Sequence, residues 1–114
     1  MRDDAMMIQI EVNDNKFIEK LFEKESINIG DEISIPGDAT LRYENSLSRR
    51  NVLPIDSSVL ELTLSFGSGV ASSLVASWIY SKLRNDIRSI RIERKIVEVD
   101  KNEIRKIIEE RIKY

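Results

Sequence analysis

The sequence has no cysteine and no histidine. Without cysteine, the chain can form no disulfide, use no catalytic thiol and bind no zinc through thiolates. Without histidine, it lacks the usual general base near neutral pH and the commonest metal ligand in proteins. We therefore expect a protein that is not an enzyme and that holds no metal and no cofactor.

The chain also has little net charge. The formal value is −2 over 114 residues, which gives no general attraction to nucleic acid or membranes. The opening residues, MRDDAMMIQI, carry acids and no long apolar region, so no secretory signal is predicted and a reducing cytoplasm is the expected compartment. The length, with 41% hydrophobic and 33% charged residues, is typical of one soluble domain, residues 1–114, with an apolar core.

The longest uncharged stretch, LTLSFGSGVASSLVASWIYS, fills the 20 positions between Glu61 and Lys82. This length would suffice for a membrane span. However, six of its residues are serine, and its first part alternates apolar and polar residues as a strand does. The helical part, from about Gly69 to Leu83, is too short to cross a bilayer. We therefore predict a strand, a glycine turn and a helix in the core, and no membrane association.

Periodicity elsewhere predicts further strands and helices. Alternating apolar residues predict strands at Met7–Val12 and Ser57–Phe66 and a hairpin over Ile87–Val99. A helical period predicts helices at Lys16–Lys24, Gly69–Leu83 and after Asp100, the first of them capped by Asn13-Asp14-Asn15. The expected fold is α+β: a mainly antiparallel sheet of about four to six strands with two or three helices packed on it, ending in the hairpin and a helix.

The hairpin and the last helix have local signals of their own. A hairpin tip at Arg94-Lys95 pairs two sets of apolar residues on one face, Ile92 with Val97 and Ile90 with Val99. In the helix, Asp100 is the N-cap, Glu103 completes a capping box and Val99 can staple against Ile104. The apolar stripe of this helix consists of Ile104, Ile107, Ile108 and Ile112.

Residues from about 26 to 56 are predicted to form a loop-rich insert. Ile33 and Ile35 indicate one short strand and Leu41–Glu44 another, with turn signals at Gly30-Asp31 and at Pro36-Gly37-Asp38. The polar, basic segment Ser46–Asn51 is predicted to be an exposed loop. Its Arg49-Arg50 pair could clamp an anion, although a solvated loop explains the pair better.

Carboxylates are plentiful, but their spacing defines no site. Asp31-Glu32, Asp38 and Asp56 lie in or near predicted loops, where a metal ion or an acid–base pair can be held. Turn and surface roles are favoured for all of them. A small enzyme that uses only carboxylates, lysine or serine is therefore the least favoured function.

The Gly67-x-Gly69 turn lies between a predicted strand and a predicted helix, where backbone amides can cradle a phosphate. Three features argue against a nucleotide site. Ser72 replaces the third glycine of a dinucleotide-binding fingerprint, no Lys-Ser or Lys-Thr follows as in a P-loop, and the next element is a hairpin instead of a parallel strand. A structural turn is the favoured interpretation.

Small residues recur along the central helix. Gly69, Ser73, Ser77 and Ser81 are four residues apart and form one narrow stripe. The stripe could contact another subunit, or it could let the helix lie close to its own sheet, which is the favoured interpretation. Trp78 is expected in the core, with a partner contact as the alternative.

Charge is unevenly distributed along the chain, −6 over residues 1–40 and +4 over residues 41–114. Six bases stand against only Asp86 and Glu93 in one stretch: Lys82, Arg84, Arg88, Arg91, Arg94 and Lys95. This stretch is a candidate contact for nucleic acid or another anionic ligand. Tyr80 is the only aromatic residue near it, whereas single-strand binding favours several.

The second half of the chain, about Val59 to Ile112, has a familiar layout: a strand, the glycine turn and small-residue helix GSGVASSLVASWIYSKL, the hairpin RSIRIERKIVEV and the capped helix DKNEIRKIIEERI. This layout resembles the effector-associated constant component family and similar small bacterial α+β modules of conflict systems. The resemblance implies a companion of variable effector domains with no enzymatic activity, and it carries over no catalytic residue. The family-like hairpin would carry an Asn-Gly or glycine-rich tip, which this chain lacks.

Together these observations predict a non-enzymatic protein–protein interaction or adaptor module. The expected partner is another protein, a second copy of the chain in a homo-oligomer, or both. The alternative is a nucleic-acid or anionic-ligand binder that uses residues 82–95.

Overall fold

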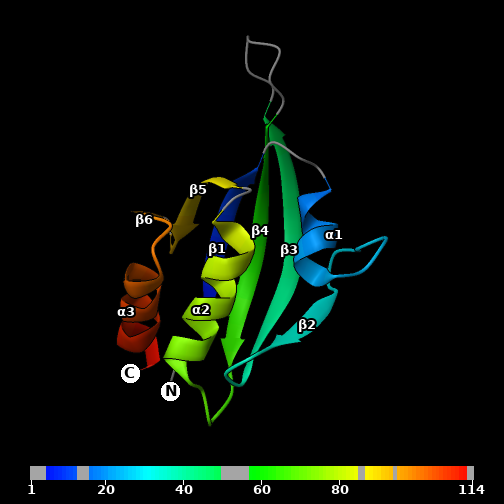
Figure 1. The fold of residues 1–114 in the computed structure, drawn as a ribbon. Helices are drawn as coiled ribbons and strands as arrows, with labels where there is room; N and C mark the ends of the chain where they lie inside the picture. Colours follow the sequence, from blue (N-terminus) through cyan, green and yellow to red (C-terminus); the bar gives the residue numbers. More distant parts are fainter. Residues whose placement is uncertain (1–4, 13–15, 50–56, 85–86, 94, 113–114) are drawn as a thin grey trace.

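Six strands form one antiparallel sheet in the order β2-β3-β4-β1-β5-β6 (Figure 1). The computed structural model describes residues 5–12, 16–49, 57–84, 87–93 and 95–112. The strands are β1 (Ala5–Val12), β2 (Glu32–Ile35), β3 (Ala39–Arg49), β4 (Ser57–Phe66), β5 (Ile87–Ile92) and β6 (Lys95–Val97). The predicted α+β class and the predominantly antiparallel sheet are confirmed.

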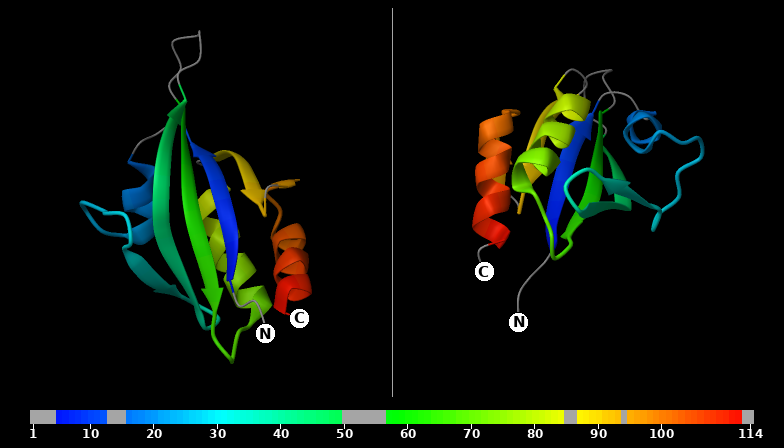
Figure 2. Two further views of the ribbon diagram at one scale, coloured as in Figure 1. Left: turned by 180° about the vertical axis from the view of Figure 1, so that it is seen from behind. Right: turned by 60° about the horizontal axis from the view of Figure 1, so that its bottom comes forward.

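Helices lie on one side of this sheet. They are α1 (Phe17–Phe22), α2 (Ser72–Leu83) and α3 (Lys101–Ile112). Figure 1 shows α1 and α2 in front of the strands and α3 beside α2, whereas the view from behind in Figure 2 shows strands with no helix over them. Within the described residues, every helix falls short of the length and apolar character that crossing a bilayer would require.

Strict alternation in the central strands decides which face is buried. In β1, Ile8 and Ile10 are buried on the helix side, and the buried Leu62 and Leu60 of β4 are opposite them. The residues between them point to the uncovered face, where Gln9 Nε2 donates to Glu61 Oε2 at 3.3 Å. Because side chains change face at every residue, this pattern fixes the register of β1 against β4.

The predicted exposed loop at Ser46–Asn51 is wrong for residues 46–49. These residues continue β3, which runs for 11 residues and pairs with β4 as far as Arg49 opposite Ser57. A bulge between Tyr43 and Asn45 shifts the register there, and the exposed Ser46 stands opposite the buried Leu60. A polar residue is tolerated at position 46 because its side chain, on the helix side of the sheet, is exposed. Arg50 and Asn51 lie outside the described residues.

The hairpin of β5 and β6 forms as predicted, but its register is wrong by two residues. Ile92 pairs with Lys95 and Ile90 pairs with Val97, so Glu93 lies in the turn. Glu93 has a φ of 51°, in the left-handed region that a tight two-residue turn needs. The shift by an even number of residues keeps the same apolar side chains on the inner face.

The helix predictions are confirmed with adjusted ends. The first helix is shorter than predicted, and its apolar face is buried: Phe17, Ile18, Leu21 and Phe22. The cap predicted for it at residues 13–15 lies outside the described residues. In α3, Asp100 Oδ2 accepts the backbone N–H of Glu103 at 3.1 Å, as the capping box predicts. Ile104 and Ile108 are buried, and Ile107 and Ile112 are half-buried.

Candidate functional site

An open groove with a volume of about 750 Å³ lies between β6 and α3. Its sides come from segments far apart in the sequence: the start of β1, residues 92–93 and 95–98 of the hairpin segment, and α3. The apolar residues of the lining are Met6, Ile92, Ile96, Val97 and Ile107. The charged residues are Glu93, Glu98, Glu103 and Glu110 together with Lys95 and Arg111. The lining of the groove therefore combines five apolar side chains with four carboxylates and two basic side chains.

The hairpin of β5 and β6 forms one wall of the groove. β6 is the last strand of the sheet, so within the described residues one of its edges has no neighbouring strand. Ile96 lies in the middle of β6 and exposes 73% of its surface. Val97 turns to the helix side and packs against the core. Sheet edges are commonly protected by charge or by brevity. β6 is short and carries Lys95, and Ile96 is the large apolar side chain that it leaves exposed.

The capped helix α3 forms the other wall of the groove. Its buried residues Ile104 and Ile108 fix the helix against the core, which directs Ile107 toward the groove as a half-buried side chain. Glu103 and Glu110 are exposed one turn on either side of Ile107. The wall therefore offers an apolar strip between two carboxylates.

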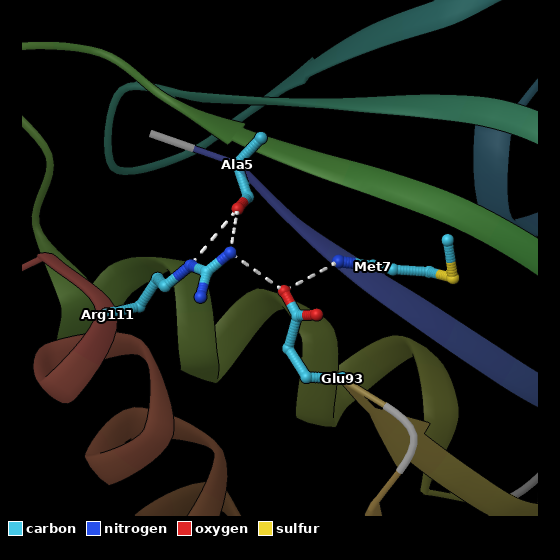
Figure 3. Close-up of polar contacts among 4 residues, drawn as sticks. All are labelled: Ala5, Met7, Glu93 and Arg111. Atoms are coloured by element: carbon cyan, nitrogen blue, oxygen red, sulfur yellow. Dashed lines mark hydrogen bonds and ion pairs between the residues drawn. The ribbon is translucent and has the colours of Figure 1, made fainter. Parts of the chain in front are cut away.

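The inner end of the groove is closed by a polar cluster (Figure 3). The last residue of β5 lies opposite Ile8, so β1 extends past the end of β5 at Ala5–Met7. Arg111 of α3 donates to the Ala5 carbonyl from Nε at 3.2 Å and from Nη2 at 2.9 Å. Glu93 lies 3.1 Å from Arg111 Nη2 and accepts the Met7 N–H at 3.3 Å. Two side chains thus form hydrogen bonds with the backbone of β1 at the place where a neighbouring strand would otherwise form them.

The Gly67-x-Gly69 turn holds a carboxylate from its own chain. Asp38, in the turn between β2 and β3, accepts the N–H of Gly69 at 2.9 Å through Oδ2. The Gly67 N–H donates to the Asp38 carbonyl at 2.8 Å. A Cβ at Gly67 would meet the Asp38 carboxylate. The amide that a phosphate would need is therefore bonded internally, which supports the structural interpretation of this turn.

The small-residue stripe does not lie on the sheet, so the favoured interpretation of it is wrong. Gly69, Ser73 and Ser81 are exposed and Ser77 is half-buried. The helix instead packs through larger side chains: Val75, Ala76, Ile79 and Leu83. An unpaired serine hydroxyl is costly to bury against an apolar sheet, whereas these side chains gain from burial. A subunit contact through the stripe remains a prediction.

Trp78 packs half-buried against the core, and the ammonium group of Lys82 lies over its ring. Lys82 Nζ lies 5.8 Å from the ring centroid and 2.6 Å from Glu23 Oε1 at the end of α1. The hydrogen bond from Lys82, together with its charge, lowers the pKa of Glu23 from its ordinary value of 4.5. This contact ties α2 to α1 and leaves Lys82 engaged within the fold.

The structure does not bring the predicted basic residues together. Lys82 points to α1, and Arg84 is exposed just after α2. Arg91 pairs with Gln9 and so faces the uncovered side of the sheet, whereas Lys95 lies on β6 at the groove. The side chains of Arg88 and Arg94 lie outside the described residues.

The predicted carboxylates are likewise separate. Asp31 accepts the Asn28 N–H at 2.9 Å and lies 3.6 Å from Lys24, whereas Asp38 holds the glycine turn. Asp56 and Arg50 lie outside the described residues. Among the residues that are described, there is no group of three acidic side chains placed to hold a metal ion.

Sequence reasoning missed the groove and its three central residues, Glu93, Ile96 and Arg111. One signal for Arg111 was present, because it lies three and four residues after Ile108 and Ile107, on the apolar side of its helix. Comparisons with family models, with curated proteins and with solved structures found no match. The resemblance to the effector-associated constant component family therefore remains a prediction.

Proposed function

We propose that this protein is a non-enzymatic interaction module that binds another protein in the groove between β6 and α3. The observation that carries the proposal is the exposed Ile96 on the outer edge of β6, in a groove of about 750 Å³ lined by apolar and charged side chains. Exposed apolar surface next to polar groups is typical of protein-binding sites.

The composition of the sequence supports binding over catalysis. The chain has neither histidine nor cysteine, the two side chains most often used for acid–base and nucleophilic steps near neutral pH. The charged residues of the groove are glutamate, lysine and arginine, which suit recognition of a charged partner.

The resemblance of the second half suggests the setting. We propose a companion protein in a bacterial conflict system, acting in the cytoplasm, with a variable effector as the partner. Self-association is a second use of the same surface, since a second copy could occupy the groove. Nucleic-acid binding through residues 82–95 has less support, because Lys82, Arg91 and Lys95 face different sides of the molecule.

A capture experiment with matched variants tests this proposal. The tagged chain is used to capture proteins from the lysate of its own cells, with and without nuclease. Ile96→Ser is compared with Ile29→Ser, because Ile29 is 67% exposed and lies outside the groove. We expect a stoichiometric protein that survives nuclease, is lost with Ile96→Ser and is kept with Ile29→Ser. Equal capture by the two variants, or a nucleic-acid signal alone, would contradict the proposal.

A further inference from the structure

The free edge of β6 has backbone groups that point away from the sheet. Glu93 donates its N–H to the Met7 carbonyl at 3.0 Å, so the backbone of this residue points to β1. Backbone direction alternates along a strand, so the N–H and C=O of Ile92 point to β6, where Lys95 is opposite. The next residue, Ile96, therefore directs its N–H and C=O outward, to the edge where the described part of the chain places no strand.

Side chains around this edge leave room for an extended segment. Ile96 is opposite Arg91 in the strand register, and Arg91 is opposite Gln9. The side chain of Ile96 therefore lies on the uncovered face of the sheet. Val97 lies on the other face, toward α3, and Ile107 stands across the groove. A strand added beside β6 would alternate in the same way, with one side chain beside Ile96 and the next directed at α3.

The charge of the groove favours basic side chains in a strand that is added to β6. Four glutamates and two bases line it, and one of these bases, Arg111, is already bonded to Glu93. Glu103 and Glu110 are exposed on the wall that the added strand would face. Lysine or arginine suits this wall, because the aliphatic stem can lie along Ile107 while the charged head reaches a carboxylate.

We propose that the groove binds an extended segment of a partner protein, which adds to β6 as a further strand. Its apolar side chain covers Ile96, and its lysine or arginine side chains face Glu103 and Glu110. Backbone hydrogen bonds to Ile96 fix the segment, and the alternating side chains select it. This inference rests on the proposed function, and it names the chemistry of the partner and the way it binds.

Amide hydrogen exchange of the full chain tests the binding mode. The probe is a short peptide in which lysine and isoleucine alternate, added to the isotopically labelled protein. We expect exchange of the Ile96 amide to slow by about tenfold or more at saturation, because that N–H becomes bonded. A peptide with glutamate in place of lysine, and one with serine in place of isoleucine, serve as controls and are expected to leave the exchange rate unchanged.

N-methylation of the probe separates strand addition from side-chain binding. Methyl groups on the alternate amides that face β6 should abolish binding, and methyl groups on the other amides should leave it intact, because only one set of N–H groups bonds to the edge. Equal effects of the two methylated peptides would overturn strand addition.

Variants of the protein test the charge argument. Glu103→Lys and Glu110→Lys should each weaken the binding of the lysine–isoleucine peptide by about two- to fivefold, as expected for exposed ion pairs. Glu25→Lys makes the same change of charge at an exposed residue outside the groove and should have little effect. Equal weakening by all three variants would show long-range attraction only and would overturn the assignment of these carboxylates.

The outcomes also distinguish this inference from the proposed function. Absence of peptide binding, or binding without protection of Ile96, overturns strand addition. If Ile96→Ser still abolishes capture of the cellular partner in that case, the groove remains the binding site. Protection of Ile96 that rises with protein concentration in the absence of peptide would make a second copy the occupant and would overturn the choice of a basic partner segment.

Discussion

The guanidinium of Arg111 lies 3.1 Å from the carboxylate of Glu93, and these two side chains bond the backbone of β1 where β5 ends. One residue comes from the last helix and the other from the hairpin turn. Their contact therefore joins both walls of the groove to the N-terminal strand, and the shape of the groove depends on it.

Replacement of Arg111 should loosen this end of the molecule. Arg111→Ala leaves the Ala5 carbonyl without its guanidinium donors, and we expect the free energy of unfolding to fall by about 1–2 kcal/mol. Arg111→Lys keeps the charge but loses the planar guanidinium. Its free energy of unfolding should therefore lie between those of the wild type and of Arg111→Ala. Urea unfolding measures both, with Lys106→Ala as a control on an exposed position of α3. An Arg111→Ala protein as stable as the Lys106→Ala protein would contradict this role.

The Gly67 turn should be intolerant of a side chain. In Gly67→Ala the added Cβ would meet the Asp38 carboxylate, and we expect a loss of about 1–3 kcal/mol. Gly69→Ala is the matched control, because the nearest atom to a Cβ there is 3.4 Å away, at ordinary contact distance.

The double variant Gly67→Ala with Asp38→Gly isolates this clash. Glycine suits position 38 because Asp38 has a φ of 58°. If the clash is the cause, the second substitution should recover part of the stability, and the two effects will not add. Thermal or urea unfolding of the four proteins measures the coupling, and strict additivity would refute the clash.

The Glu23–Lys82 contact predicts a pH dependence in the acid range. Lys82 lowers the pKa of Glu23 in the folded state below its ordinary value of 4.5. The ion pair therefore stabilises the fold above that value, and this stabilisation is lost as the pH falls through the lower folded pKa. The difference in urea midpoint between the wild type and Glu23→Gln should be larger at about pH 7 than at about pH 2–3. Glu25→Gln, at an exposed neighbouring position, should show no such change, and an equal difference at both pH values would contradict the assignment.

Elements with strong local patterns were predictable from the sequence. The strand β4 was predicted at its observed bounds, because each apolar residue from Leu60 to Phe66 alternates with a polar one. The start of α3 was predictable because Asp100 and Glu103 form a capping box within one turn. In both cases the signal lies within the element itself.

The missed features depend on contacts between elements. The polar sequence of β3 after Asn45 reads as a loop, and it becomes a strand only because β4 continues beside it. The hairpin register depends on the bond between Glu93 and the Met7 carbonyl, 86 residues away in sequence. The groove combines both effects, so no single segment of the sequence indicates it.

The most direct test of the account is the hydrogen-exchange footprint of the captured partner on the full chain. The account predicts protection of residues 95–98 and of the Glu103–Arg111 face of α3, with little change elsewhere. Protection confined to the serine stripe of α2, at Ser73, Ser77 and Ser81, would contradict it and would move the binding surface from the groove to α2.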